Sequence, residues 1–337
     1  METLIQFMNQ WSSALCDGLL NWCDLIDCES TEIITFQRLR PRCPILVLSG
    51  ATPGPFYHSH PHISKEFDCV SFELEDQIRA NIGTIRRIAR AATGANAPVE
   101  PQKNSQFFKQ PLTIHWVSGN GSGHSSNIKT VEQVAPQAWK DEGMTGEKTL
   151  AIYRTGGNVS DRRFLLESFA MFGLTDSEPG DTKACTRIDL WDEFDSVDGD
   201  IYNVKGKKYF MPYVPGYLIS GPTDLALFSI AAGTRAEEPA LPAEEQITAT
   251  VRQLLQALRS MNCEFADVAL LWNRCMNLDK NENAILTVRS TFGLRRPLAE
   301  SVLEVDASND PNPCGSDGEP VALEYIVLAQ IPRQSQY

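Results

Sequence analysis

One short segment of this sequence occurs twice, and the duplication limits the possible fold more than any other feature. Residues 75–82 read EDQIRANI and residues 244–251 read EEQITATV, an offset of 244 − 75 = 169 in a chain of 337 residues. Both copies are typical of helix starts, because acidic residues there interact favourably with the positive end of the helix dipole. The elements expected around each copy also follow in a similar order. The sequence therefore predicts one α/β unit that is used twice.

Hydrophobic periodicity predicts alternating strands and helices in both halves. The first half is expected to contain strands at 45–48, 112–117 and 149–154 and helices at 72–92, 131–140 and 162–172. The second half is expected to contain helices at 244–261 and 282–291 and strands at 217–219, 225–231, 268–277, 300–306 and 321–331. Such an order predicts α/β (α+β) units, each a mixed sheet covered on one face by helices.

The predicted elements divide the chain into four segments. Residues 1–43 form an N-terminal helical extension, since apolar residues recur at helical spacing over residues 3–27. Residues 44–175 and 209–332 are the two α/β units. The segment between them, 176–208, is rich in acidic residues, and this composition favours a connector at the surface.

The charge of the chain argues against several kinds of partner. Thirty Lys and Arg against 43 Asp and Glu give a formal net charge of −13, with a pI near 4.9. Such a charge repels phosphate backbones and anionic lipid unless a basic cluster is present, and the sequence shows none. No apolar run approaches the ~20 residues that cross a bilayer, and the nine cysteines are scattered. We therefore predict a cytoplasmic protein that binds neither nucleic acid nor membranes.

The second half of the chain resembles the YjgF/Rid family through several linked motifs. Tyr217 precedes a strand, residues 244–247 begin a long helix, and residues 267–272 form the following strand. Residues 296–302 (RPLAESV) resemble the proline-alanine-arginine stretch of the family, and residues 323–326 (LEYI) resemble its terminal, glutamate-bearing strand.

The first half resembles the same fold more weakly, through the strand at 45–48 followed by Ser49-Gly50. Two such units in one chain, the first degenerate, are similar to the chorismatases. The resemblance implies two YjgF/chorismate-mutase-like units, and it implies a homotrimer with pockets at subunit boundaries.

Glu324 is the leading candidate for a catalytic residue. Strand alternation places it on one face with Ala322, Ile326 and Leu328. A carboxyl group among apolar neighbours is desolvated, which favours its neutral form and suits a general acid. The resemblance implies a related role, because the glutamate at this place in YjgF/Rid proteins and chorismatases is thought to handle a proton or a water. The alternative is a structural carboxylate that is paired with a nearby arginine.

The substrate-binding candidates depart from the family pattern. Glu300 stands where the YjgF/Rid motif has the arginine that holds a substrate carboxylate. Arg295 and Arg296 are close enough in sequence to take over that contact, if their guanidinium groups are suitably placed. The strand after Tyr217 also lacks the arginine expected of a chorismatase. Both departures weaken the case for chorismate or an amino-acid-derived imine as substrate.

Three further residues are candidates for contact with a substrate. Tyr213 and Tyr217 flank a Pro-Gly turn that is able to aim a phenol into a pocket, although packing explains them equally well. Cys314 lies in the polar loop 306–320, whose length is typical of a substrate lid, although a lone cysteine is more often unreactive.

Neither a metal nor a cofactor is predicted. The histidines His58, His60 and His62 form a cluster, but Pro61 restrains the backbone and no cysteine or carboxylate completes a ligand set. The glycine-rich segment 119–123 lacks the Lys-Ser/Thr of a phosphate-binding loop.

These features together predict an enzyme of small-molecule, secondary metabolism. Glu324 is expected to donate or accept a proton on an enol ether, enamine or similar polarised double bond, with Tyr217 or Tyr213 orienting the substrate. The resemblance implies a hydrolase, while lyase, isomerase and cyclase chemistry stay open. Two alternatives are a non-catalytic binding or regulatory protein of the same fold and an imine/enamine deaminase of the ordinary Rid type.

Overall fold

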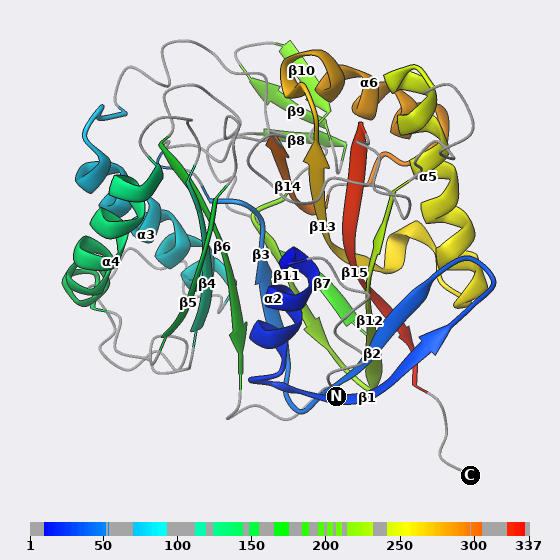
Figure 1. The fold of residues 1–337 in the computed structure, drawn as a ribbon, viewed down its shortest axis with the longest axis horizontal. Coiled ribbons are helices and arrows are strands. Elements are labelled where there is room, and N and C mark those ends of the chain that lie inside the picture. Colours follow the sequence, from blue (N-terminus) through cyan, green and yellow to red (C-terminus); the bar gives the residue numbers. More distant parts are fainter. Residues whose placement is uncertain are drawn as a thin grey trace.

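Two six-stranded sheets lie face to face at the centre of the protein, and helices cover their outer faces (Figure 1). The computed structural model describes residues 10–51, 53, 70–92, 112–118, 124–143, 148–154, 165–174, 184–188, 195–198, 201–204, 207–210, 214–231, 241–296, 298–304 and 322–333. The layers confirm the predicted mixed sheets with helices on one face. The other face of each sheet is buried against its counterpart.

Sheet A holds most strands of the second half, in the order β1-β2-β12-β15-β13-β14. Its strands are β1 (Cys23–Ser30), β2 (Thr35–Pro41), β12 (Thr223–Ile230), β13 (Val268–Cys275), β14 (Ala299–Glu304) and β15 (Leu323–Pro332). Helices α5 (Ala243–Ser260) and α6 (Leu278–Thr291) cover its outer face, and the short helix η3 (Phe265–Asp267) precedes β13.

Sheet B holds most strands of the first half, in the order β5-β4-β6-β3-β11-β7. Its strands are β3 (Ile45–Leu48), β4 (Leu112–Ser118), β5 (Lys148–Arg154), β6 (Leu166–Gly173), β7 (Ala184–Ile188) and β11 (Gly216–Ser220). Helices α3 (Leu74–Ala92) and α4 (His124–Asp141) cover its outer face.

The strand pairing confirms that one unit is used twice. In sheet A, β12 pairs antiparallel with β15, β15 pairs antiparallel with β13, and β13 pairs parallel with β14. In sheet B, β3, β6, β4 and β5 pair in the same order with the same directions. Four strands of each sheet therefore share one topology.

The duplicated glutamine makes the same contacts in both halves. Gln77 donates to the carbonyl oxygen of Ser71 at 2.8 Å and accepts from the backbone N–H of Leu165 at 2.8 Å. Gln246 donates to the carbonyl oxygen of Leu241 at 2.7 Å and accepts from the N–H of Ala322 at 2.8 Å. Each glutamine thus ties the start of its helix to the start of the last strand of its unit, which explains why the helix-start motif occurs twice.

Each sheet contains strands from the other half of the chain. β2 lies directly before β3 in the chain but pairs with β12 in sheet A. β11 lies directly before β12 but pairs with β3 in sheet B. Each sheet is therefore completed by a strand from the other half, and the sequence boundary near residue 209 does not separate the sheets.

Several predicted elements differ from the structure. The helix expected at 162–172 is wrong, because residues 166–173 form β6, which is buried along its whole length. A short apolar run fits a buried strand and a buried helix equally well, so periodicity could not separate them. The N-terminal helix is described as α2 (Gln10–Leu19), and the chain becomes strand β1 after Trp22.

The acidic segment 176–208 is more than a connector. Its residues include β7, which pairs with β11 at the edge of sheet B. They also form a three-stranded antiparallel sheet of β8 (Asp195–Asp198), β9 (Ile201–Val204) and β10, which ends just beyond the segment (Lys207–Phe210).

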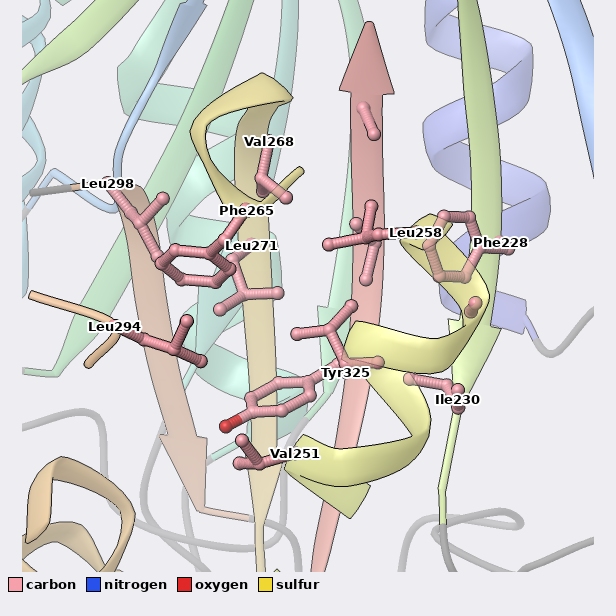
Figure 2. Close-up of a cluster of buried hydrophobic side chains, with 14 of the residues drawn as sticks. Phe228, Ile230, Val251, Leu258, Phe265, Val268, Leu271, Leu294, Leu298 and Tyr325 are labelled. Atoms are coloured by element: carbon pink, nitrogen blue, oxygen red, sulfur yellow. The ribbon is translucent and has the colours of Figure 1, made fainter. Parts of the chain in front are cut away.

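Apolar side chains fill three layers between these elements. Figure 2 shows part of the layer under α5, where Val251 and Leu258 from the helix face Leu271 and Tyr325 from sheet A. A second layer lies between the two sheets and includes the ring contact of Phe169 with Trp272, whose centroids are 4.4 Å apart. A third layer lies between sheet B and helices α3 and α4. The middle layer makes the two halves one folded unit.

The close approach of β11 to β3 predicts that any larger residue at Gly216 destabilises the protein. A Cβ atom there would lie 2.5 Å from the carbonyl oxygen of Val47 and 3.2 Å from the Cα of Leu48, both in the backbone of β3. We expect Gly216→Ala to lower the free energy of unfolding by about 1–3 kcal/mol, as overpacked sites do. Urea denaturation measures the difference. Gly83→Ala is the control, because its Cβ meets no atom closer than 3.9 Å and alanine favours the helix. Equal stability of Gly216→Ala and the wild type would refute the close approach.

Candidate functional site

Glu324 forms a buried ion pair with Arg274. The two residues are directly opposite in the antiparallel pairing of β15 and β13. Arg274 Nη1 lies 2.5 Å from Glu324 Oε2, and the exposed fractions of the two side chains are 0% and 7%. A positive neighbour at this distance favours the carboxylate form of Glu324, against the desolvation that the sequence analysis emphasised.

The ion pair lies on the face of sheet A that points towards sheet B. Alternation along β15 places Glu324 on the same face as Ile326 and Leu328, and both of these pack in the layer between the sheets. Arg274 shares its face of β13 with Trp272, which packs in the same layer. The pair therefore lies at the end of the inter-sheet layer where β13 ends and β15 begins.

Glu300 lies on the opposite face of sheet A, under α6. Arg289 Nη1 donates to Glu300 Oε1 at 2.7 Å and to Oε2 at 2.8 Å, and Asn273 Nδ2 donates to Oε1. Burial raises the pKa of Glu300, and the contacts with Arg289 and Asn273 oppose that rise. The structure therefore does not bring Glu300 together with Glu324, because the sheet separates their side chains.

Arg296 and Tyr217 contact each other rather than Glu324. The Arg296 guanidinium lies over the Tyr217 ring at 4.7 Å from its centroid. Its Nη1 also donates to the backbone carbonyl oxygens of Phe265, Ala266 and Val268 around η3. Tyr217 is buried, and this burial raises the pKa of its phenol. These contacts hold β11 against the start of β13, so Arg296 is engaged by the protein itself.

Of the remaining sequence candidates for the site, the structure describes Arg295 but not Tyr213 or Cys314. The side chain of Arg295 is exposed, and its N–H donates to the Gly293 carbonyl oxygen at 3.0 Å. Tyr213 and Cys314 lie outside the residues that the structure describes, as do the histidines of the 58–62 cluster.

The Ser-Gly turn after β3 joins the first half of the chain to the second. Ser49 Oγ accepts from the N–H of Glu300 at 2.8 Å and donates to the carbonyl oxygen of Val214. The N–H of Gly50 donates to the Glu300 carbonyl oxygen at 3.3 Å. Ser49 is fully buried. The turn thus fixes the end of β3 against the start of β14.

The first half contains its own equivalent of Glu324. The glutamine contacts align Leu165 with Ala322, an offset of 322 − 165 = 157, so Glu167 matches Glu324. Glu167 is fully buried. The residue opposite it in β4 is Val117, at the position that Arg274 holds in β13. The carboxylate is thus present in both units, whereas the arginine opposite it is present in the second unit alone.

Sequence reasoning missed both Arg274 and Glu167. The helix-start motif repeats with an offset of 169, whereas the last strands of the two units, β6 and β15, align with an offset of 157. The signal in the sequence that identifies Glu167 is this second offset of 157 residues, which matches Glu167 on β6 with Glu324 on β15. Arg274 became recognisable only through the register of β13 and β15, which a single sequence does not show.

Among the described residues, no group of three or more His, Cys, Asp or Glu side chains is placed to hold a metal ion. None of the described helices is both long and apolar enough to cross a membrane.

Comparisons with known proteins find similarity among solved structures only. No protein-family model matches the sequence, and no curated protein matches it significantly. Escherichia coli TdcF with bound serine is 14% identical, with 37% of this chain and 91% of that chain covered and a TM-score of 0.26.

Two further solved structures are similar at the same level. Rv2704 from Mycobacterium tuberculosis is described as a member of the YjgF/YER057c/UK114 family; it is 17% identical, with 44% of this chain and 100% of that chain covered and a TM-score of 0.24. A putative endoribonuclease from Thermotoga maritima is 16% identical, with 36% and 88% covered and a TM-score of 0.25. This chain is similar to proteins of the YjgF family, which the motifs at 209–332 also resemble.

Proposed function

We propose that this protein is an enzyme in which Glu324 transfers a proton to or from a small molecule with an enol ether, enamine or similar polarised double bond. One observation carries the proposal: Glu324 keeps 7% of its side chain exposed, while its partner Arg274 is completely buried. The carboxylate is therefore the less deeply buried member of the pair. A substrate at the end of the inter-sheet layer would meet Glu324 first.

The surroundings of Glu324 suit proton transfer. Two sheets pack around it with Trp272, Ile326 and other apolar side chains, so water is largely excluded from the layer. A positioned carboxylate in such a place contributes roughly 10²–10⁴-fold to a rate by general acid or base catalysis. The resemblance to YjgF/Rid proteins and chorismatases supports hydrolysis, with elimination, isomerisation or cyclisation as related reactions of the same group. A homotrimer is part of the proposal and rests on that resemblance, and a cytoplasmic location is part of it on the ground of the scattered cysteines.

Glu324→Gln should lower turnover about 10²-fold or more while the protein stays folded, because the amide cannot transfer the proton. The measurement is product formation from a panel of enol ethers and enamines, followed by mass spectrometry. Glu167→Gln is the matched control, since it makes the same change at the equivalent position of the first unit. Unchanged turnover in Glu324→Gln, with circular dichroism like that of the wild type, would exclude the proposal.

A non-catalytic binding or regulatory protein is the second candidate function. It is favoured by the contacts of the charged groups, since Arg296 is engaged by backbone carbonyls and Glu300 is engaged by Arg289. Neither is placed to hold a substrate carboxylate, which also argues against an imine/enamine deaminase. Metabolites that raise the melting temperature without being converted would support this candidate, and release of ammonia from 2-aminoacrylate would support the deaminase.

A further inference from the structure

We infer that Arg274 is a positioning residue that holds Glu324 as a carboxylate, so that Glu324 acts as a proton acceptor. The second part of this inference rests on the proposed function, whereas the first part concerns the ion pair alone. The sequence left the direction of proton transfer open, and the ion pair distinguishes the two directions.

The geometry of the pair supports a permanent charge on Glu324. The residues are direct cross-strand partners, so the backbone of two central strands fixes their separation. The contact of 2.5 Å between Arg274 Nη1 and Glu324 Oε2 is that of a strong, charge-assisted hydrogen bond. The arginine cannot give up its proton, so a protonated Glu324 would leave a buried cation facing a neutral acid.

Other charged groups near the pair do not reverse this preference. Glu300 and Arg289 bind each other on the opposite face of sheet A. Glu167 lies on the facing sheet, and β6 begins at the same end of the molecule at which β13 ends (Figure 1). A second carboxylate there opposes a negative charge on Glu324, whereas Arg274 Nη1 contacts Glu324 Oε2 directly, at 2.5 Å.

The duplication supplies an internal comparison. Both units carry the glutamate on their last strand, and the second unit pairs it with arginine where the first unit has Val117. The first unit shows that the strand and its glutamate fold without an arginine opposite. The shared strand topology therefore does not require an arginine at this register position.

A carboxylate at this position sets the order of events in the proposed reaction. The first step breaks a C–H or O–H bond of the substrate, or of a water beside it, and forms an O–H bond on Glu324. The electron pair of the broken bond stays on the substrate side, where the polarised double bond accepts it. The proton returns to the product in a later step, so no oxidant or reductant is needed. The substrate class is therefore a small molecule with a polarised double bond. The proton that Glu324 accepts comes either from an acidic position next to that double bond or from a water that attacks it.

Infrared difference spectra of the wild-type protein and Glu324→Gln test the inference without any substrate. We expect a carboxylate stretching band, and no protonated carbonyl band, from Glu324 at neutral pH. The difference spectrum between Arg274→Met and Arg274→Met/Glu324→Gln reports the same band without the arginine. Its titration midpoint should lie about 1 to 3 pH units or more above that of the wild-type protein. Arg274→Lys keeps the positive charge and should keep the wild-type band. Glu167→Gln, which changes the other unit, should leave the Glu324 band in place.

A protonated carbonyl band from Glu324 in the neutral wild-type protein would overturn the inference, as would a midpoint that does not move in Arg274→Met. If Arg274→Met does not fold, the wild-type spectrum and its titration against Glu324→Gln still decide the protonation state. The absence of turnover on every substrate would count against the proposed function alone, because the vibrational result does not depend on activity.

Discussion

Glu300→Ala should lower the free energy of unfolding by about 3–5 kcal/mol, the typical cost of removing one partner from a buried ion pair. Arg289 donates two hydrogen bonds to this carboxylate, and its own side chain is only 3% exposed. Without Glu300, the guanidinium is left in a core between sheet A and α6 that cannot solvate it. Urea denaturation followed by circular dichroism measures the loss.

Two comparisons make the Glu300 prediction specific. Arg289→Met combined with Glu300→Leu removes both charges, and replacing a whole buried pair by apolar residues is often neutral or stabilising, so it should recover most of the loss. Asp141→Ala breaks the exposed pair with Arg79, which solvent screens, and should cost far less than Glu300→Ala. A Glu300→Ala protein no less stable than Asp141→Ala would show that Arg289 finds another partner.

Asp224→Asn should cause a loss of similar size, about 3–5 kcal/mol, because one buried carboxylate there contacts three arginines. Asp224 on β12 is fully buried and lies 2.9 Å from Arg38 Nε, 3.0 Å from Arg40 Nε and 3.4 Å from Arg333 Nε. Arg38 also donates to the carbonyl oxygen of Pro332 at 2.6 Å. The cluster fastens the β1-β2 hairpin onto β12 and β15, so its loss should loosen the exchanged hairpin first.

The Asp224 contribution should depend on pH in a defined direction. Burial by itself raises the pKa of Asp224, but the hydrogen bonds from Arg40 and Arg38 outweigh it, and the net pKa is lowered in the folded protein. A lowered folded pKa stabilises the protein above the unfolded value of about 3.9, and this contribution is lost as the pH falls through the folded pKa.

The difference in unfolding free energy between wild type and Asp224→Asn should therefore be constant near neutral pH and shrink below about pH 4. Asp24→Ala, which breaks the exposed pair with Arg42, is the control and should cost at most about 1 kcal/mol. A difference that persists undiminished at low pH would mean that the charge of Asp224 is not what stabilises the hairpin.

Much of the fold could be predicted from the sequence because the strongest signals are local. The amphipathic stripe of 74–92 and the apolar run of 45–48 became α3 and β3, and the glutamine motif identified the repeat. Residues 166–173 were misassigned because their surroundings, and not their periodicity, decide between helix and strand. The exchange of β2 and β11 could not be predicted, since pairing with the distant sheet depends on contacts across about 180 residues.

The candidate site was predictable only in part. Alternation on β15 placed Glu324 on the same face as Ile326 and Leu328, whereas Ala322, also expected on that face, packs in the layer under α5. Its charged partner and the face occupied by Glu300 depended on strand register and on α6. Arg296 looked available in the sequence, but three backbone carbonyls and the Tyr217 ring take up its guanidinium.

The strand exchange has a consequence for synthesis on the ribosome. The β1-β2 hairpin is complete at Pro41, but its partner β12 begins at Thr223, so 223 − 41 = 182 residues separate the two. At ~5–20 residues per second, one edge of the hairpin waits about 10–40 s for its pairing strand. During that time its arginines have not yet met Asp224. The nascent first half must therefore stay soluble with an open sheet edge until residues 216–230 emerge and supply β11 to β3 and β12 to the hairpin.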